Sequence, residues 1–66
     1  GSKLAGLFNL GKDQRSIELL FHELNFKGKV KLRDIWEQND LGIFEKSYLA
    51  KLPSHGVQLL KVTPFD

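Results

Sequence analysis

Few side chains of this 66-residue sequence have the chemistry of a catalytic or metal-binding group. The candidates are two histidines, His22 and His55, and Ser54, which directly precedes His55. The histidines fall in separate turn-like segments, and neither belongs to a cluster of cysteine, aspartate or glutamate with the spacing of metal ligands. Ser54 and His55 are neighbours on one turn without a third group to orient the histidine, so they do not form a nucleophile–base pair. The sequence therefore predicts no catalytic residue, no metal site and no cofactor.

Charged and aromatic side chains near the middle of the chain allow two kinds of contact. Trp36 has a ring that suits a sugar face, with Tyr48 as a second ring of this kind. The other interpretation is that the Trp36 indole packs in a core or between domains and gives its N–H to one partner. Arg33 and Asp34 are able to clamp a polar ligand, but an ion pair of small energetic value is the more common role. We favour packing for Trp36 and an ion pair for Arg33 and Asp34.

The length and composition indicate one thin core. The chain has 66 residues, 41% of them hydrophobic, and no cysteine. A domain of this size buries only about 60% of the surface of its unfolded chain, and no disulfide is available to add stability. We therefore expect either modest stability or a larger parent protein that covers one face.

The charge is balanced and dispersed. Ten basic and eight acidic residues give a net charge of +2, spread along the chain rather than gathered on one face as nucleic-acid binding requires. No apolar run approaches the roughly 20 residues of a membrane span. No secretory signal begins the sequence, and the compartment stays open, with a secreted or periplasmic parent as one alternative. We expect neither a nucleic-acid nor a membrane partner.

The elements that must position these residues are clearest in the second half of the chain. Runs rich in apolar residues alternate there with clusters of turn formers, which is typical of antiparallel strands joined by reversals. The runs are residues 29–36, 43–52 and 57–63, and the turn clusters are residues 37–42 and 53–56.

Side-chain patterns within these runs predict their place in a sheet. Residues 47–52 alternate cleanly, with the even-numbered side chains inward. Residues 57–63 are apolar on both sides, so we expect that strand in the middle of a sheet. In the first run, Asp34 interrupts the apolar side that ends at Trp36, which predicts a bulge or the end of the strand.

The first third of the chain is less certain in its secondary structure. Residues 3–10 are typical of a strand buried on both faces, and residues 11–13 form a turn. Residues 16–24 fit an amphipathic helix, because their apolar side chains recur at helical spacing, but also fit a strand that forms a hairpin with residues 3–10. Local preference favours the helix slightly, although a helix of about nine residues is marginal without tertiary support. Both alternatives stay open at this level.

An ordered set of short motifs resembles a known family. The set resembles the C-terminal β-domain of α-galactosidases of glycoside hydrolase family 27, the melibiase type, over most of the chain. Its motifs are Leu7-Phe8-Asn9, Leu32-Arg33-Asp34-Ile35-Trp36, Asp40-Leu41-Gly42, Phe44, Tyr48, Ala50, Pro53-Ser54-His55-Gly56-Val57 and Leu59-Leu60-Lys61. The resemblance implies a strand in the ambiguous segment, followed by a tight turn at residues 22–25.

The resemblance also implies a fold and a role. Such enzymes join a TIM barrel that hydrolyses terminal α-galactosides to an antiparallel β-sandwich, and the two catalytic carboxylates lie in the barrel. No carboxylate here matches those positions. We therefore expect residues 1–66 to be a single all-β, non-catalytic C-terminal domain of a larger glycoside hydrolase. It would be a small antiparallel sandwich or meander of about five to six strands, with an incomplete sandwich as an alternative.

The partner implied by this role is the catalytic barrel of the same parent chain. The candidates for contact with that barrel, or with a sugar, are Trp36, Ile43 and Leu49. Leu49 and Gln58 depart from the family pattern, which has a small polar residue and a valine at these positions. Two other functions stay open: an autonomous carbohydrate-binding module that uses Trp36 and Tyr48, with weak affinity for carbohydrate, and a small basic β-domain that binds nucleic acid.

Overall fold

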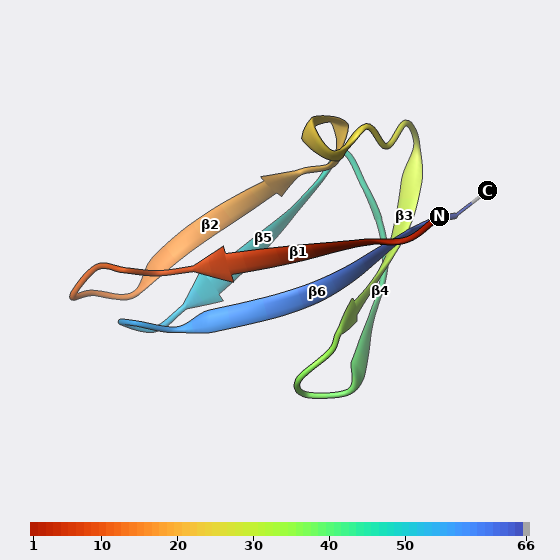
Figure 1. Ribbon diagram of the computed structural model, residues 1–66. Helices are drawn as coiled ribbons and strands as arrows, with labels where there is room; N and C mark the ends of the chain where they lie inside the picture. Colours follow the sequence, from red (N-terminus) through yellow and green to blue (C-terminus); the bar gives the residue numbers. More distant parts are fainter. Residues whose placement is uncertain (66) are drawn as a thin grey trace.

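The chain forms two antiparallel sheets, so the all-β prediction is confirmed. The computed structural model describes residues 1–65, which contain six strands and one 3₁₀ turn (Figure 1). The elements are β1 (Lys3–Phe8), β2 (Arg15–Leu20), η1 (Phe21–Leu24), β3 (Lys29–Asp34), β4 (Asn39–Glu45), β5 (Ser47–Leu52) and β6 (Val57–Pro64). None of these described elements is a helix long and apolar enough to cross a membrane.

The strands form a four-stranded sheet in the order β1-β6-β3-β4 and a two-stranded sheet of β2 and β5. Figure 1 shows β2 and β5 as a separate layer beside β1 and β6. The chain passes between the sheets at Lys46, the single residue between β4 and β5, whose φ of 74° turns the strand direction. The sheets pack face to face as an open sandwich.

The core lies between the two layers. It is formed by the side chains of each sheet that face the other sheet. Phe21 of η1, which is 1% exposed, covers one end of this core. The buried apolar residues are Ala5, Leu7, Phe21, Val30, Leu32, Ala50, Leu52, Leu60 and Val62. The strands β1, β3, β5 and β6 each contribute alternate residues to this set, as the two-residue period of a strand requires. Partly buried side chains of β2 and β4 pack against it.

The later strands follow the predictions in part. The run 43–52, expected as one strand, is divided at Lys46 between the end of β4 and β5, which lie in different sheets. β5 has the predicted bounds, with Ala50 and Leu52 buried and Leu49 exposed. β6 lies between β1 and β3, so its central position is confirmed. The turn before β4 is shorter than expected, because β4 already begins at Asn39.

The strand β1 departs from the prediction that both of its faces are buried. Ala5 and Leu7 are buried, but Leu4 and Phe8 are 66% and 58% exposed. The strand also ends at Phe8, and Leu10 is 84% exposed. The physical reason is that only one side of the four-stranded sheet is covered by the second layer of the described chain.

The ambiguous segment is a strand and then a turn. β2 pairs with β5 along its whole length, so the hairpin with residues 3–10 does not form, because β1 pairs with β6 in the other sheet. The turn η1 follows β2, with Asn25 in the left-handed conformation at its end. The strand implied by the resemblance is confirmed, and the slight local preference for a helix is wrong. Pairing with β5 overrides a short helical pattern that has no helix to pack against.

The predicted interruption near Asp34 is also present. β3 ends at Asp34, and the pairing with β4 shifts register between Leu32 and Arg33, where Leu41 is the extra residue. Gly42 has a φ of 110° at this bulge, a conformation that glycine adopts without strain. Trp36 lies beyond the strand end and does not share the apolar side of β3.

Candidate functional site

The three contact residues predicted from the sequence lie on three different surfaces. Trp36 lies in the turn between β3 and β4 and is 65% exposed. Ile43 lies on β4, opposite Lys31, and faces away from the second layer. Leu49 lies on β5, opposite Glu18, on the far side of the two-stranded sheet. The fold does not bring these three side chains together.

The two aromatic residues considered for sugar binding are also separated. Tyr48 is half-buried, and its ring packs edge-on against Phe44 with centroids 5.1 Å apart. Its hydroxyl donates to Oε1 of Gln58 at 3.4 Å. Trp36 is exposed in the β3–β4 turn, so the two rings do not form one platform.

A buried asparagine, the last residue of the Leu7-Phe8-Asn9 motif, joins three segments of the chain. Asn9 is 1% exposed, and its Nδ2 lies 2.8–3.0 Å from the carbonyl oxygens of Asp13, Leu52 and Pro53. Its Oδ1 accepts a hydrogen bond from the Gly11 N–H. The side chain thereby joins the β1–β2 turn to the end of β5. Its sequence signals are its place at the end of the Leu7-Phe8-Asn9 motif and its position two residues before the turn that begins at Gly11.

A second buried polar group lies at the end of β3. Asp34 is 7% exposed, and its carboxylate accepts hydrogen bonds from the Glu37 N–H at 2.9 Å and from Nε2 of Gln58 at 3.0 Å. Gln58, one of the departures from the family pattern, therefore supplies a partner for Asp34. Both carboxylate oxygens are engaged, which indicates a structural role rather than proton transfer.

The predicted ion pair of Arg33 has a different partner. Arg33 and Asp34 are adjacent in a strand and point to opposite sides, so the expected pair does not form. Arg33 instead donates to Asp40 at 2.8 Å. This hydrogen bond lowers the pKa of Asp40; a weaker desolvation effect opposes it, and the charges of Arg33 and Lys31 add to the lowering.

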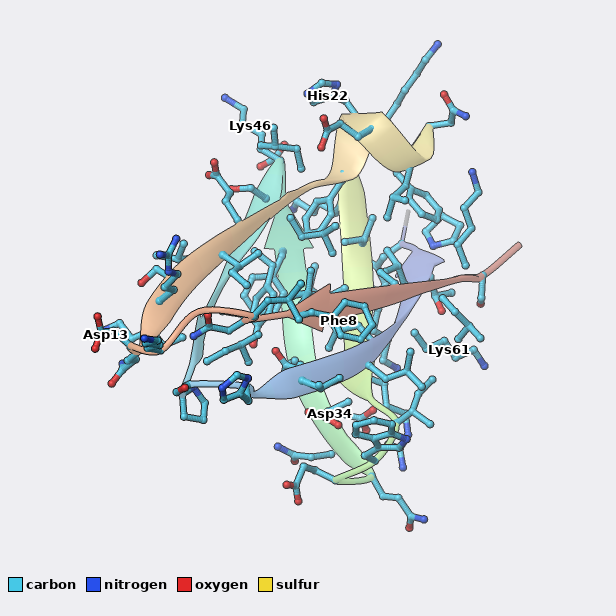
Figure 2. The ribbon with its side chains drawn as sticks, turned by 60° about the vertical axis from the view of Figure 1, so that its left-hand side comes forward. Phe8, Asp13, His22, Asp34, Lys46 and Lys61 are labelled. Atoms are coloured by element: carbon cyan, nitrogen blue, oxygen red, sulfur yellow. The ribbon has the colours of Figure 1, made fainter. Side chains whose placement is uncertain are left out.

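The histidines lie in different turns of the fold. His22 lies in η1 and His55 in the turn between β5 and β6, and both are exposed. Figure 2 shows His22 and Asp34 at opposite ends of the molecule. Within residues 1–65, no three histidine, aspartate or glutamate side chains are placed to hold a metal ion.

The described chain has concave surfaces, of which two are relevant to contact with a partner. The larger, about 510 Å³, lies beside η1 over Leu20, Phe21 and Phe26, with Lys27 and Lys46 at its rim. The smaller, about 210 Å³, is a basic groove on the four-stranded sheet, lined by Lys31, Arg33, Asp40, Lys61 and Thr63.

An apolar stripe lies next to the basic groove. We define the outer stripe as Leu4, Phe8, Val57 and Leu59, on the side of the four-stranded sheet that faces away from β2 and β5. Phe8 pairs with Val57, and Gly6, which lies between Leu4 and Phe8, pairs with Leu59. The Phe8 ring lies over Gly6, where an added Cβ would be 3.1 Å from the ring. In Figure 2, Phe8 stands out from β1, with Lys61 to its right. The arrangement offers surfaces for contact rather than a set of reacting groups.

The fold and sequence match known proteins. A family model described as "Alpha galactosidase C-terminal beta sandwich domain" matches residues 1–62. A "Probable alpha-galactosidase" from Dictyostelium discoideum is 32% identical over 68 residues, which cover 97% of this chain and 18% of that protein.

Two solved structures share the fold. A GH27 β-L-arabinopyranosidase from Geobacillus stearothermophilus is 25% identical with a TM-score of 0.92, covering 97% of this chain and 15% of that one. Alpha-galactosidase I from Mortierella vinacea is 25% identical with a TM-score of 0.86, covering 96% of this chain and 18% of that one. The chain thus spans less than a fifth of the relatives it matches. The resemblance found in the sequence is confirmed, and the chain belongs to the family of α-galactosidase C-terminal β-sandwich domains.

Proposed function

We propose that this chain is the non-catalytic C-terminal module of a larger glycoside hydrolase that acts on terminal α-galactosides. Residues 1–66 form one domain that packs on the catalytic barrel of the parent enzyme and stabilises it. The observation that carries this proposal is the family match over residues 1–62, together with the small share of each whole relative that the chain covers.

The placement of Asp34 and Asp40, the two carboxylates in the family motifs, supports a non-catalytic role. Glycoside hydrolysis commonly needs two carboxyl groups about 5–10 Å apart across an open site, one of them free to transfer a proton. Asp34 is buried with both oxygens hydrogen-bonded, and Asp40 is held in an ion pair by Arg33. Neither carboxylate is available for that chemistry.

The small core supports a role in which this domain and the catalytic domain stabilise each other. The described chain has nine buried apolar residues and no cysteine. A domain of this kind gains stability when a second domain covers its exposed apolar surface, and the second domain gains by the same contact.

The test compares the parent enzyme with the same enzyme cut before this module. Removal of the module should shorten the half-life of 4-nitrophenyl α-galactoside hydrolysis at raised temperature and leave the KM of the surviving enzyme nearly unchanged. The isolated 66-residue chain should not hydrolyse this substrate. An unchanged half-life, or hydrolysis by the isolated chain, would contradict the proposal.

A further inference from the structure

The outer faces of the two sheets differ in composition. The outer stripe places four apolar side chains side by side on β1 and β6, with Leu4 66%, Phe8 58% and Val57 39% exposed. The outward positions of the two-stranded sheet are mostly polar, and Leu49 is its one exposed large apolar side chain among the described residues. Those positions are Ser16, Glu18, Leu20, Ser47, Leu49 and Lys51. Contiguous exposed apolar side chains mark contact sites, whereas single ones are ordinary.

The total surface also indicates an uncovered face. The accessible surface is 4752 Å², whereas a compact monomer of this mass is expected to expose about 4250 Å². The molecule measures only 15 Å along its shortest axis.

The charges beside the outer stripe indicate which chemistry a partner surface should have. Lys31 and Lys61 line the basic groove, and the described chain has a single ion pair there, between Arg33 and Asp40. Self-association through this face would bring the two lysines of one copy against the lysines, the apolar stripe or Asp40 of the other. The first two arrangements are unfavourable, because like charges repel and a desolvated cation needs a partner, and Asp40 is already paired with Arg33. The face therefore suits a surface that is apolar with adjacent carboxylates better than it suits a second copy.

We propose that the outer face of the four-stranded sheet is where this domain contacts the catalytic domain of its parent enzyme, a placement that rests on the function proposed above. The outer stripe packs on apolar side chains of the catalytic domain. At the border of that contact, Lys31 and Lys61 form ion pairs with carboxylates of the catalytic domain. The two-stranded sheet, including Leu49, faces solvent.

The first experiment uses the parent enzyme and a matched control. Phe8→Ser with Val57→Ser removes the pair of apolar side chains at one end of the stripe. Leu49→Ser removes a side chain with the same 58% exposure as Phe8 on the opposite sheet. The stripe variant should shorten the half-life of activity at raised temperature by about tenfold or more, because a buried apolar anchor commonly carries this much of an interface. The control should change it by less than about twofold. The same variants in the isolated chain correct for any effect on the fold.

The second experiment tests the charges. Lys31→Glu with Lys61→Glu in the parent enzyme should shorten the half-life by several-fold, because carboxylates would then face carboxylates. Lys51→Glu on the two-stranded sheet is the control and should have little effect. If the two variants shorten the half-life equally, the catalytic domain does not present carboxylates to Lys31 and Lys61.

The third experiment reports contact directly. The chain has no cysteine, so Phe8→Cys and Leu49→Cys each introduce one thiol into it. In the isolated chain both should react with a maleimide at similar rates. In the parent enzyme the thiol at position 8 should react at least about tenfold more slowly, and the thiol at position 49 at an unchanged rate.

The outcomes separate this placement from the function on which it rests. If removal of the whole module leaves the half-life unchanged, the proposed function fails. If removal shortens the half-life while the thiol at position 8 stays reactive and the stripe variant matches Leu49→Ser, the function stands and this placement is wrong. Protection at position 49 alone would assign the contact to the two-stranded sheet.

Discussion

On the inner face of the four-stranded sheet polar side chains are buried, and on its outer face apolar side chains are exposed. The inner exceptions, Asn9, Asp34 and Gln58, have hydrogen-bond partners within the chain. The outer apolar residues Phe8 and Val57 are opposite each other in the β1–β6 pairing and remain 58% and 39% exposed. Burial of a polar group is tolerated when its partners are supplied, and exposure of an apolar group is relieved only by another surface.

Substitutions on the two faces should therefore affect different properties of the protein. Substitutions on the inner face should change the stability of the isolated chain, since its partners are inside the chain. Substitutions on the outer face should leave the isolated chain nearly unchanged and act only when the domain is joined to its partner. The predictions below test this separation from the largest effect to the smallest.

Asn9→Ala should have the largest effect on the isolated chain. It leaves three carbonyl oxygens and one N–H without the Asn9 side chain, and at about 1 kcal/mol per hydrogen bond the unfolding free energy should fall by about 2–4 kcal/mol. For a domain of this size that is a drop in Tm of about 10–25 °C, measured by circular dichroism. Leu10→Ala, at an exposed neighbouring position, is the control. Equal effects of the two would show that the hydrogen bonds of Asn9 are not what holds this end together.

Gln58→Val should have an intermediate effect. The valine matches the family pattern but removes the Nε2 donor from the buried carboxylate of Asp34, which should cost about 1–2 kcal/mol. Tyr48→Phe removes only the long 3.4 Å contact to Gln58 and should cost less than about 0.5 kcal/mol. Urea unfolding measures both. A Gln58→Val chain as stable as the original would mean that Asp34 does not depend on Gln58.

Phe8→Lys should have a small effect in the isolated chain. The ring is 58% exposed, and the lysine stem can cover Gly6 in its place, so the unfolding free energy should change by no more than about 1 kcal/mol. Urea unfolding again provides the measurement. A loss as large as that of Asn9→Ala would break the separation between the faces.

Asp40→Asn should have the smallest effect, visible mainly in its pH dependence. The pKa of Asp40 is lowered in the folded chain by Arg33, so its contribution is present above the ordinary carboxyl range and is lost as the pH falls through the lowered pKa. The original chain should therefore lose slightly more stability than the variant between about pH 5 and about pH 2. The pair is exposed and screened by salt, so high salt should diminish the difference. Identical pH profiles at low salt would show that the pair contributes nothing.

Much of the second half of the chain could be predicted from its sequence. The bounds of β5 follow from clean alternation and from Pro53, which cannot continue a ladder. The central place of β6 follows from apolar residues on both of its sides. These signals are local, so a single sequence contains them.

Other features depended on partners distant in the chain. The helical pattern of residues 16–24 was misleading, because β2 exists through its pairing with β5. The structural role of Asn9 was missed because its main acceptors, Leu52 and Pro53, lie more than forty residues away along the chain. The predicted contacts Trp36, Ile43 and Leu49 were chosen one at a time, and only the fold shows that they lie on separate surfaces.

The sequence alone determined that the chain is an antiparallel β-domain, where most of its later strands run and which family it belongs to, because alternation, turn residues and ordered motifs are properties of the chain itself. Only the tertiary structure decided which apolar residues remain outside. That depends on the order in which strands pair and on which side of each sheet the second layer covers. In this molecule the two-stranded sheet covers one side of the four-stranded sheet and leaves Leu4, Phe8, Val57 and Leu59 on the other.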